Sequence, residues 1–210
     1  MSIKIFPTRS FDSASAYSEA YFAELQLARR SIAPEAIDAA ARLLLDVIKT
    51  DATILSCGNG GSAAISNHLL CDYLKGIRTG TNIRTRVKSL SSSPELITAI
   101  ANDISFDDIF AYQVTSLGRP GDLLIATSSS GQSPNIVRAI EAAHQHGLKV
   151  VAMTGFAGGT ASKMADVSLH VASGNYGIVE DIHQSLMHIL AQYLRHAHLV
   201  NPQDLGVTRF

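Results

Sequence analysis

The sequence predicts an α/β fold, a doubly wound and mostly parallel five-stranded sheet with an N-terminal helical extension. From residue 52 onward, short apolar runs alternate with segments of helical period, as in parallel sheets that carry helices on both faces. A glycine-rich turn follows the first of these runs, and a serine-rich turn follows a later one. The chain has 210 residues, of which 46% are hydrophobic, and can bury one core without disulfide bonds.

The first 50 residues indicate two helices. Asp12 or Ser13 can cap the first helix, whose apolar side chains recur at helical spacing. Pro34 suits the first turn of the second helix, which has a buried stripe of its own. We assign residues 1–50 to the helical extension and residues 51–200 to the α/β domain. The extension is a candidate oligomerisation surface.

Each strand is expected where an apolar run is short and ends in turn residues. These runs span residues 52–57, 86–90, 122–127, 148–154 and 167–171. Helical periodicity between and after them predicts helices at residues 62–74, 94–101, 107–117, 134–146, 160–164 and 179–195. A turn is expected at Asn102-Asp103, and an irregular tail after His198.

The composition excludes several classes of protein. With 17 Lys and Arg against 18 Asp and Glu, the formal net charge is -1, which argues against a nucleic-acid partner and against a polybasic membrane anchor. No apolar run approaches the roughly 20 residues of a membrane span. The N-terminus lacks the pattern of a signal peptide. Cys57 and Cys71 cannot form a disulfide framework, so we expect two small buried thiols and a cytoplasmic location.

Two strand-to-helix loops have the composition of anion sites. Cys57–Ser62 is rich in glycine, which lets the backbone approach a ligand at the positive end of the following helix. Thr127–Ser133 offers four serine hydroxyls in the equivalent place. A tight turn explains the first loop equally well, and helix capping by Ser133 explains part of the second. Together they favour a phosphate monoester, because ligands gather at the carboxyl ends of strands.

Four side chains form a candidate metal or acid–base cluster. His68 and Asp72 are four residues apart on one helix, so both lie on one face. Glu180 and His188 are eight residues apart on another helix, about 80° around its axis. Two imidazoles and two carboxylates suit a divalent metal, zinc included, and equally suit proton transfer without one. Taken singly, each is also explained as a solvated or core side chain.

The ordered motifs resemble those of the sugar isomerase (SIS) domain, and within it those of the phosphoheptose isomerases. The resemblance runs from the N-terminal helices to about His198. It is carried by Cys57–Ala64 with His68, Ala101–Asp103, Asp107–Phe110, Gly118–Asp122, Ser128–Ser133, Thr154-Gly155, and Glu180–His183 with His188.

The resemblance implies a role for each matching residue. Substrate contacts are implied for Asn59, Gly60, Gly61, Ser62, Asn102, Asp103, Ser128, Ser129, Ser130 and Ser133. Metal contacts are implied at His68, Asp72, Glu180 and His188, with catalytic roles for the last three. The family typically forms homotetramers with sites at subunit interfaces, and its reaction needs no organic cofactor.

Three positions depart from the family pattern. Asp72 stands where the family usually has Glu, Glu180 stands where it usually has Gln, and Gly177 replaces an acidic residue. All four metal positions still hold groups that bind metal, but one carboxylate is shorter and one is new. Two hypotheses follow: Glu180 acts as the base while Asp72 mainly holds metal, or the substrate differs from sedoheptulose 7-phosphate.

The expected activity is aldose–ketose isomerisation of a phosphorylated sugar through an enediol. The sugar implied by the resemblance is sedoheptulose 7-phosphate, converted to a heptose 7-phosphate. The alternatives are non-catalytic: a binding protein like the replication-initiator-associating relatives, or a regulatory sugar-phosphate sensor. Either alternative would keep the scaffold without needing a base.

Overall fold

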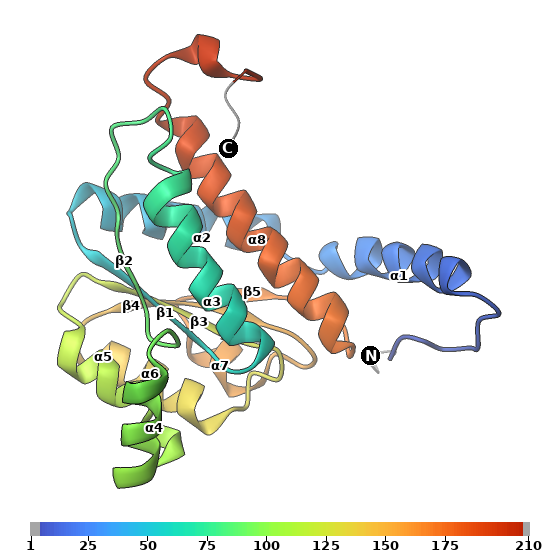
Figure 1. Cartoon of the computed structure of the whole chain (residues 1–210), viewed down its shortest axis with the longest axis horizontal. Coiled ribbons are helices and arrows are strands. Elements are labelled where there is room, and N and C mark those ends of the chain that lie inside the picture. The colour runs from blue at the N-terminus through green and yellow to red at the C-terminus, as the bar shows by residue number, and fades with distance from the viewer. Residues whose placement is uncertain (1–4, 208–210) are drawn as a thin grey trace.

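Five parallel strands form the sheet of residues 5–207, the part of the chain that the computed structural model describes. They are β1 (Thr53–Gly58), β2 (Arg86–Ser89), β3 (Leu123–Ser128), β4 (Lys149–Thr154) and β5 (Val167–His170), in the order β2-β1-β3-β4-β5. The direction of winding reverses between β1 and β3, which are neighbours in the sheet (Figure 1). The predicted fold class is confirmed.

Helices flank the sheet and extend from it. The α-helices are α1 (Ala14–Arg29), α2 (Pro34–Lys49), α3 (Gly61–Cys71), α4 (Pro94–Asp103), α5 (Ala111–Leu117), α6 (Pro134–Gln145), α7 (Gly159–Met164) and α8 (Tyr176–Ala197). A π-helical turn, η1 (Asp72–Gly76), continues α3, and 3-10 turns lie at η2 (Phe106–Asp108) and η3 (Pro202–Asp204). Ser13 caps α1 through its hydroxyl, and Pro34 begins α2, as expected.

Successive residues of each strand point to opposite faces, and this alternation builds two cores. On one face, Ile54, Leu123 and Val151 pack under α2, α3 and α8. On the other face, Leu55, Leu124 and Val150 pack under α5, α6 and α7. Both faces are therefore buried, which explains why the strands are apolar along their length rather than alternating.

The strands end level with one another where the two candidate loops begin. Gly58 at the end of β1 pairs with Thr127 near the end of β3, and Ser128 pairs with Thr154 of β4. The glycine-rich loop and the serine-rich loop thus leave neighbouring strands at the same edge of the sheet. This edge, at the point where the winding reverses, is where ligands bind in open α/β sheets.

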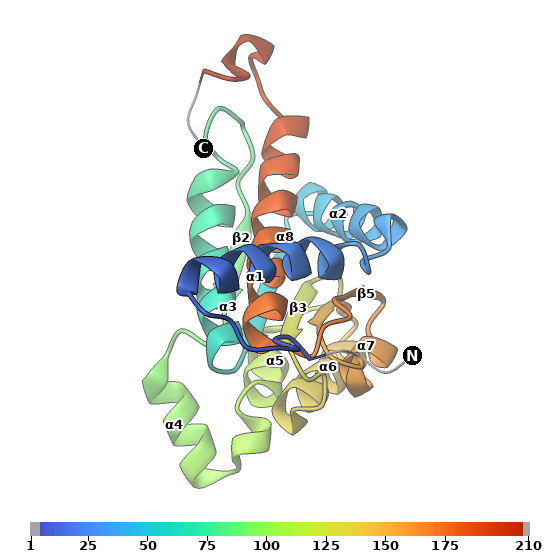
Figure 2. The same ribbon diagram turned by 90° about the vertical axis from the view of Figure 1, so that its right-hand side faces the viewer.

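The long helix α8 lies beside α3 on one face of the sheet (Figures 1 and 2). Asn175 caps it, because its side-chain oxygen accepts a hydrogen bond from the N–H of Ile178 at 3.1 Å. Its apolar stripe, which includes Ile182, Leu186 and Leu190, is buried in the core. That burial fixes the rotation of α8, and with it the direction of the polar residues that face α3.

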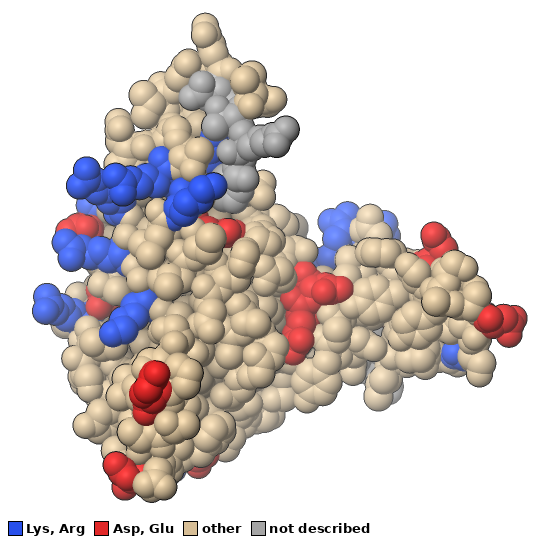
Figure 3. Space-filling view, in the orientation of Figure 1, with Lys and Arg blue, Asp and Glu red and all other residues tan. Residues whose placement is uncertain are grey.

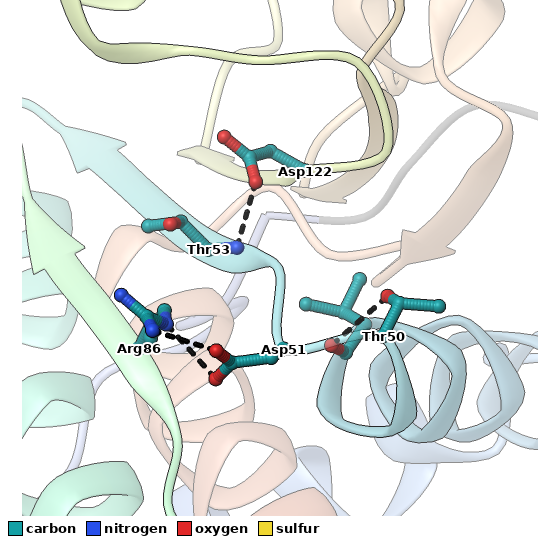
Figure 4. Close-up of polar contacts among 6 residues, drawn as sticks. Thr50, Asp51, Thr53, Arg86 and Asp122 are labelled. Atoms are coloured by element: carbon teal, nitrogen blue, oxygen red, sulfur yellow. Dashed lines mark hydrogen bonds and ion pairs between the residues drawn. The ribbon is translucent and has the colours of Figure 1, made fainter.

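Polar contacts stabilise the opposite, amino-terminal ends of the strands (Figure 4). The Asp122 carboxylate accepts hydrogen bonds from the backbone N–H groups of Thr53, at 2.7 Å, and Arg119, at 2.9 Å. Arg86 of β2 donates two hydrogen bonds to Asp51, at 2.9 and 2.6 Å. These contacts join β1, β2 and β3 away from the loops, so the carboxyl ends remain available for a ligand.

The expected helix at residues 107–117 is interrupted. Phe106–Asp108 forms a 3-10 turn instead, and α5 begins only at Ala111. The Ser105 hydroxyl donates to the Asp108 carboxylate at 2.6 Å, and Arg138 of α6 donates to the same carboxylate at 2.9 Å. These contacts stabilise a tight turn where continuous helix was expected.

The turn expected at Asn102-Asp103 lies slightly later in the chain. Both residues belong to the last turn of α4. The helix ends because the N–H groups of Ile104 and Ser105 both bind the carbonyl oxygen of Ile100, at 2.9 and 3.1 Å. A run of α-helical hydrogen bonds cannot continue past this shared acceptor.

The two cysteines differ in burial. Cys57 lies in β1 and is buried as expected, whereas Cys71 is exposed, which corrects the expectation for that thiol. Cys71 is the last residue of α3, and its neighbour Asp72 faces inward. Successive helical residues point about 100° apart, so both side chains cannot face α8.

Among the described residues, none of the helices has the length and apolar character that crossing a membrane requires.

Candidate active site

A cavity of about 270 Å³ opens between the two loops. The N-terminal end of α3 forms one side of it and the turn before α6 forms another. Its lining includes most of the predicted substrate-binding residues, together with three others: Asn59, Gly60, Gly61, Ser62, Thr127, Ser128, Ser129, Ser130, Ser133, Tyr176 and Glu180. The N-terminus of a helix attracts anions, so this cavity suits a phosphate group.

The loop's own backbone engages two of its four serine hydroxyls, because Ser128 and Ser130 accept hydrogen bonds from the N–H groups of Gly131 and Gln132. Ser133 is the N-cap residue of α6, yet its side chain makes no capping hydrogen bond. The Ser129 hydroxyl is buried and has no hydrogen-bond partner among the described residues. A buried hydroxyl without a partner is costly. The half-buried Ser133 hydroxyl in the cavity wall is therefore open to a ligand, and helix capping does not account for it.

Close backbone packing fixes the shape of the serine loop. Gly131 has a φ of +64°, and a Cβ atom there would lie 2.0 Å from the carbonyl oxygen of Gly158. The carbonyl oxygens of Gly131 and Ser129 accept hydrogen bonds from Ala161 and Gly155, both at 2.9 Å. The loop is therefore held by its carbonyls against the neighbouring turn, and only glycine fits at its tightest point.

A pair of amides joins the two loops. Asn59 donates to Asn135 at 2.8 Å, and Asn135 donates back to Asn59 at 3.0 Å. Asn135 is almost fully buried in the first turn of α6. The Asn59 side chain therefore fixes the spacing between the loops, while its neighbours Gly60 and Gly61 present backbone to the cavity.

Glu180 of α8 points into the cavity. Its carboxylate lies against Gly61, because a Cβ atom built on that glycine would be 2.3 Å from a Glu180 oxygen. Burial raises the pKa of Glu180 above its ordinary value, and the nearby charge of Asp181 raises it further. A carboxylate with a raised pKa beside a phosphate-type pocket has the character of a proton-transfer group.

Three other side chains meet between α3 and α8. The Asp72 carboxylate lies 3.5 Å from His68 Nε2 and 2.5 Å from His188 Nδ1. The two imidazole rings are 5.2 Å apart and nearly perpendicular. One ligand atom from each residue lies within 4.8 Å of the others, and Glu180 is outside this group. Two imidazoles and a carboxylate form a donor set that fits zinc or another divalent ion.

The chain is similar to known proteins over most of its length. The SIS domain profile matches residues 20–155. The phosphoheptose isomerase of Nitratidesulfovibrio vulgaris is 37% identical over 164 residues, 78% of each chain. The phosphoheptose isomerase of Aeromonas hydrophila is 40% identical over 74% of this chain and 81% of the relative.

The chain belongs to the phosphoheptose isomerase family of SIS-domain proteins. The solved structure of phosphoheptose isomerase from Neisseria gonorrhoeae matches this fold with a TM-score of 0.79 at 34% identity, over 87% of this chain and 98% of the other. The resemblance predicted from the sequence motifs is thereby confirmed, and with it the assignment to sugar-phosphate isomerases.

Two residues implied by the phosphoheptose isomerase motifs lie away from the cavity of this chain. Asn102 and Asp103 are exposed at the end of α4, and the Asn102 amide donates to the Asp103 carboxylate at 2.7 Å. Neither residue lines the cavity between the loops. Within a single chain, then, the structure brings together the two loops and Glu180 in one place, and His68, Asp72 and His188 in another.

One departure from the phosphoheptose isomerase pattern has a structural explanation. A Cβ atom at Gly177 would lie 3.0 Å from the hydroxyl of Tyr21, so a side chain there would require that hydroxyl to shift by a few tenths of an ångström. The Tyr21 hydroxyl donates to Asp181 at 2.7 Å and joins α1 to α8 beside Glu180. Burial is the main cause that raises the Tyr21 pKa, and Asp181 adds to it. The missing acidic residue thus makes room for this contact.

The sequence motifs did not assign three residues that the structure places at these sites. Asn135 joins the two loops through its amide. Tyr176 lines the cavity, and its ring packs edge-on against the ring of Phe156, with 4.7 Å between the ring centroids. Gln184 lies 2.9 Å from His188 through its side-chain nitrogen. Gln184 is four residues from both Glu180 and His188, and residues at that spacing are neighbours on a helix surface, so the sequence held a signal for this contact.

Proposed function

We propose that this chain interconverts sedoheptulose 7-phosphate and a heptose 7-phosphate through an enediol, as an aldose–ketose isomerase. The names of its relatives support the activity and the size of the sugar. The observation that carries the proposal is the position of Glu180, a carboxylate with a raised pKa in the same cavity as the serine loop. One cavity thereby offers both a phosphate anchor and a base.

The proposed mechanism begins with binding of the phosphate. The hydroxyls of Ser128–Ser130 and Ser133 and the N-terminal ends of α3 and α6 hold that group. Binding energy from the phosphate then positions C1 and C2 of the sugar. Glu180 removes a proton from C1 while the C2 carbonyl oxygen takes up a proton, which gives the enediol. Glu180 then delivers a proton, exchanged with solvent, to C2 while the C1 hydroxyl gives up its own. The raised pKa of Glu180 brings the carboxylate closer to the neutral range, where a base is most effective.

We propose that His68, Asp72 and His188 hold a divalent metal, with zinc as the expected ion. Asp72 contacts both imidazoles, so we assign it to the metal and assign the base role to Glu180. When bound, the ion would act as a Lewis acid toward an oxygen of the sugar. Both nitrogens of His188 have partners, Asp72 and Gln184, which favours a ligand role over that of a free acid.

We further propose a homotetramer in the cytoplasm. Residues 1–50 would serve assembly and residues 51–200 would bind the sugar phosphate. Phe22 and Leu27 on α1 are 62% and 59% exposed, which supports a contact with another subunit. Such a contact could bring Asn102 and Asp103 to a neighbouring cavity. Both cysteines are free, in keeping with a reducing location.

The test is conversion of sedoheptulose 7-phosphate by the wild type, by Glu180→Gln and by Glu141→Gln. Glu141 is an exposed residue of α6 and serves as the matched control. We expect Glu180→Gln to lower kcat by ~10²-fold or more, because general-base catalysis contributes that much, and Glu141→Gln to act as the wild type. Wild-type turnover by Glu180→Gln would contradict the role. Substrate binding without any conversion by the wild type would favour a sugar-phosphate sensor.

A further inference from the structure

We infer that Gln184 is a positioning residue for the candidate metal centre. Its side-chain amide holds one nitrogen of the His188 imidazole and so directs the other nitrogen toward Asp72 and His68. The inference rests on the proposed metal site, and it concerns a residue that the substrate-binding cavity does not use.

The His188 ring is held from both ends. Its Nδ1 lies 2.5 Å from Asp72 Oδ2, on the side where His68 also approaches Asp72. Its Nε2 lies 2.9 Å from Gln184 Nε2. Gln184 is one helical turn before His188 on α8, and both residues are half-buried. The ring therefore cannot turn without losing one of its two contacts.

An amide suits this position because it can donate and accept. In the ion-free protein, His188 Nδ1–H donates to the Asp72 carboxylate, so Nε2 is the acceptor for the Gln184 amide N–H. When Nδ1 binds an ion it must lose its proton, and the neutral ring then carries its proton on Nε2. Gln184 matches that state by turning its amide, so that Oε1 accepts from Nε2–H. The number of protons on the ring is unchanged.

The proposed contact is of the kind that tunes metal sites. A histidine that binds metal through one nitrogen usually donates its other N–H to an oxygen, and loss of that partner typically weakens metal binding by ~10–100-fold. An apolar side chain at position 184 would leave the ring without its outer partner. A carboxylate there would still accept from Nε2–H. The apolar change should therefore weaken zinc binding, and the carboxylate should preserve it.

The first test measures zinc affinity by competition with a chromophoric chelator. We expect Gln184→Leu to weaken zinc binding by ~10–100-fold, while Gln184→Glu stays within ~3-fold of the wild type or binds more tightly. The control is Gln145→Leu, an exposed glutamine at the end of α6, which should bind zinc as the wild type does. Unchanged zinc affinity in Gln184→Leu would overturn the inference alone. A wild type that binds neither zinc nor cobalt would overturn the metal site as well.

The second test needs no substitution at position 184. Long-range ¹H–¹⁵N spectra distinguish the two neutral imidazole tautomers, and the His188 signals are identified by their loss in His188→Asn. We expect the Nδ1–H form in ion-free wild type and the Nε2–H form after zinc is added. An ion-free His188 with its proton on Nε2, or a zinc-loaded one with its proton on Nδ1, would contradict the proposed arrangement.

Discussion

Glu180 and Asp72 carry the same chemical group in different surroundings. Glu180 stands in the cavity beside Gly61, and its pKa is raised mainly by burial. Asp72 lies between two imidazoles and its oxygens are within reach of both. A carboxylate with a raised pKa suits proton transfer, whereas a carboxylate between two imidazole nitrogens suits a metal ion that all three groups bind. In the proposed mechanism, the two departures from the family pattern thus take separate roles, Glu180 as the base and Asp72 as a metal ligand.

His183 links a single residue to the pH dependence of stability. It is fully buried in α8, and burial lowers its pKa from 6.5 to about 4. Between these values the unfolded chain binds a proton that the folded chain does not. The contribution of His183 to the free energy of unfolding is therefore fully present above pH 6.5 and is lost as the pH falls toward 4. At about 1.4 kcal/mol per pKa unit, protonation of His183 lowers the free energy of unfolding by roughly 3 kcal/mol across this pH range.

The expected result is a shallower pH dependence in His183→Leu. Urea unfolding at several values across this range measures the free energy of unfolding for each protein. His196→Leu, an exposed histidine on the same helix, should keep the wild-type dependence. Equal pH dependence in wild type and His183→Leu would show that the buried imidazole does not titrate as described.

At the scale of elements, the close approach of α8 to the start of α3 determines where Glu180 lies. Gly61 is the first residue of α3 and has an ordinary helical conformation, so alanine suits its backbone. Alanine there would place its Cβ 2.3 Å from the Glu180 carboxylate, which must then move. We expect Gly61→Ala to keep or raise the melting temperature, because alanine favours helix.

The same substitution should lower kcat by ~10-fold to 100-fold, since a small displacement of a catalytic group can cost that much. Thermal unfolding and kcat are measured on the same sample, so loss of activity through unfolding would be visible. Wild-type kcat together with an unchanged melting temperature would show that the position of Glu180 does not limit the reaction.

The sequence was sufficient to predict the elements whose signals are local. Each strand was expected within one residue of its observed ends, because apolar runs and turn residues mark them. The pair His68 and Asp72 followed from helical spacing alone. The π-helical turn at Asp72–Gly76 had no such signal, because its hydrogen bond from Ile77 to the Asp72 carbonyl competes with ordinary helix at the same residues.

The contacts that depend on packing could not be predicted in this way. Whether Glu180 reaches the candidate metal residues or the serine cavity depends on the rotation of α8 against α3, which the buried stripe of α8 sets. The contact between Gln184 and His188 depends on the same rotation. The spacing of the four candidate metal residues was compatible with a single cluster, and the structure separates Glu180 from it.

At the scale of the whole molecule, α1 projects from the body of the protein beside α8 (Figures 1 and 2). The side chains of Tyr17, Phe22 and Leu27 on this helix are exposed. On the face that carries α3 and α8, the basic side chains gather mainly toward one end, and few charges lie over the middle (Figure 3). Ile189 and Tyr193 of α8 are exposed as well. These features support burial against other subunits.

We expect the double variant Phe22→Glu, Leu27→Glu to dissociate the proposed tetramer, because charges at a buried contact must be desolvated. Sedimentation velocity measures the mass in solution. Ser18→Glu is an exposed residue of the same helix and should leave the assembly intact. A wild type that sediments as a monomer, or an unchanged mass in the double variant, would exclude this role of α1.

In the proposed mechanism, one cavity both holds the phosphate and exchanges a carbon-bound proton. The most direct measurement is NMR spectroscopy of sedoheptulose 7-phosphate incubated with the wild-type protein in D₂O. We predict that a heptose 7-phosphate appears with solvent deuterium at C2, and that sedoheptulose without the phosphate is left unchanged. A folded protein that binds the phosphorylated sugar, yet forms no aldose and exchanges no carbon-bound proton, would contradict the isomerase account.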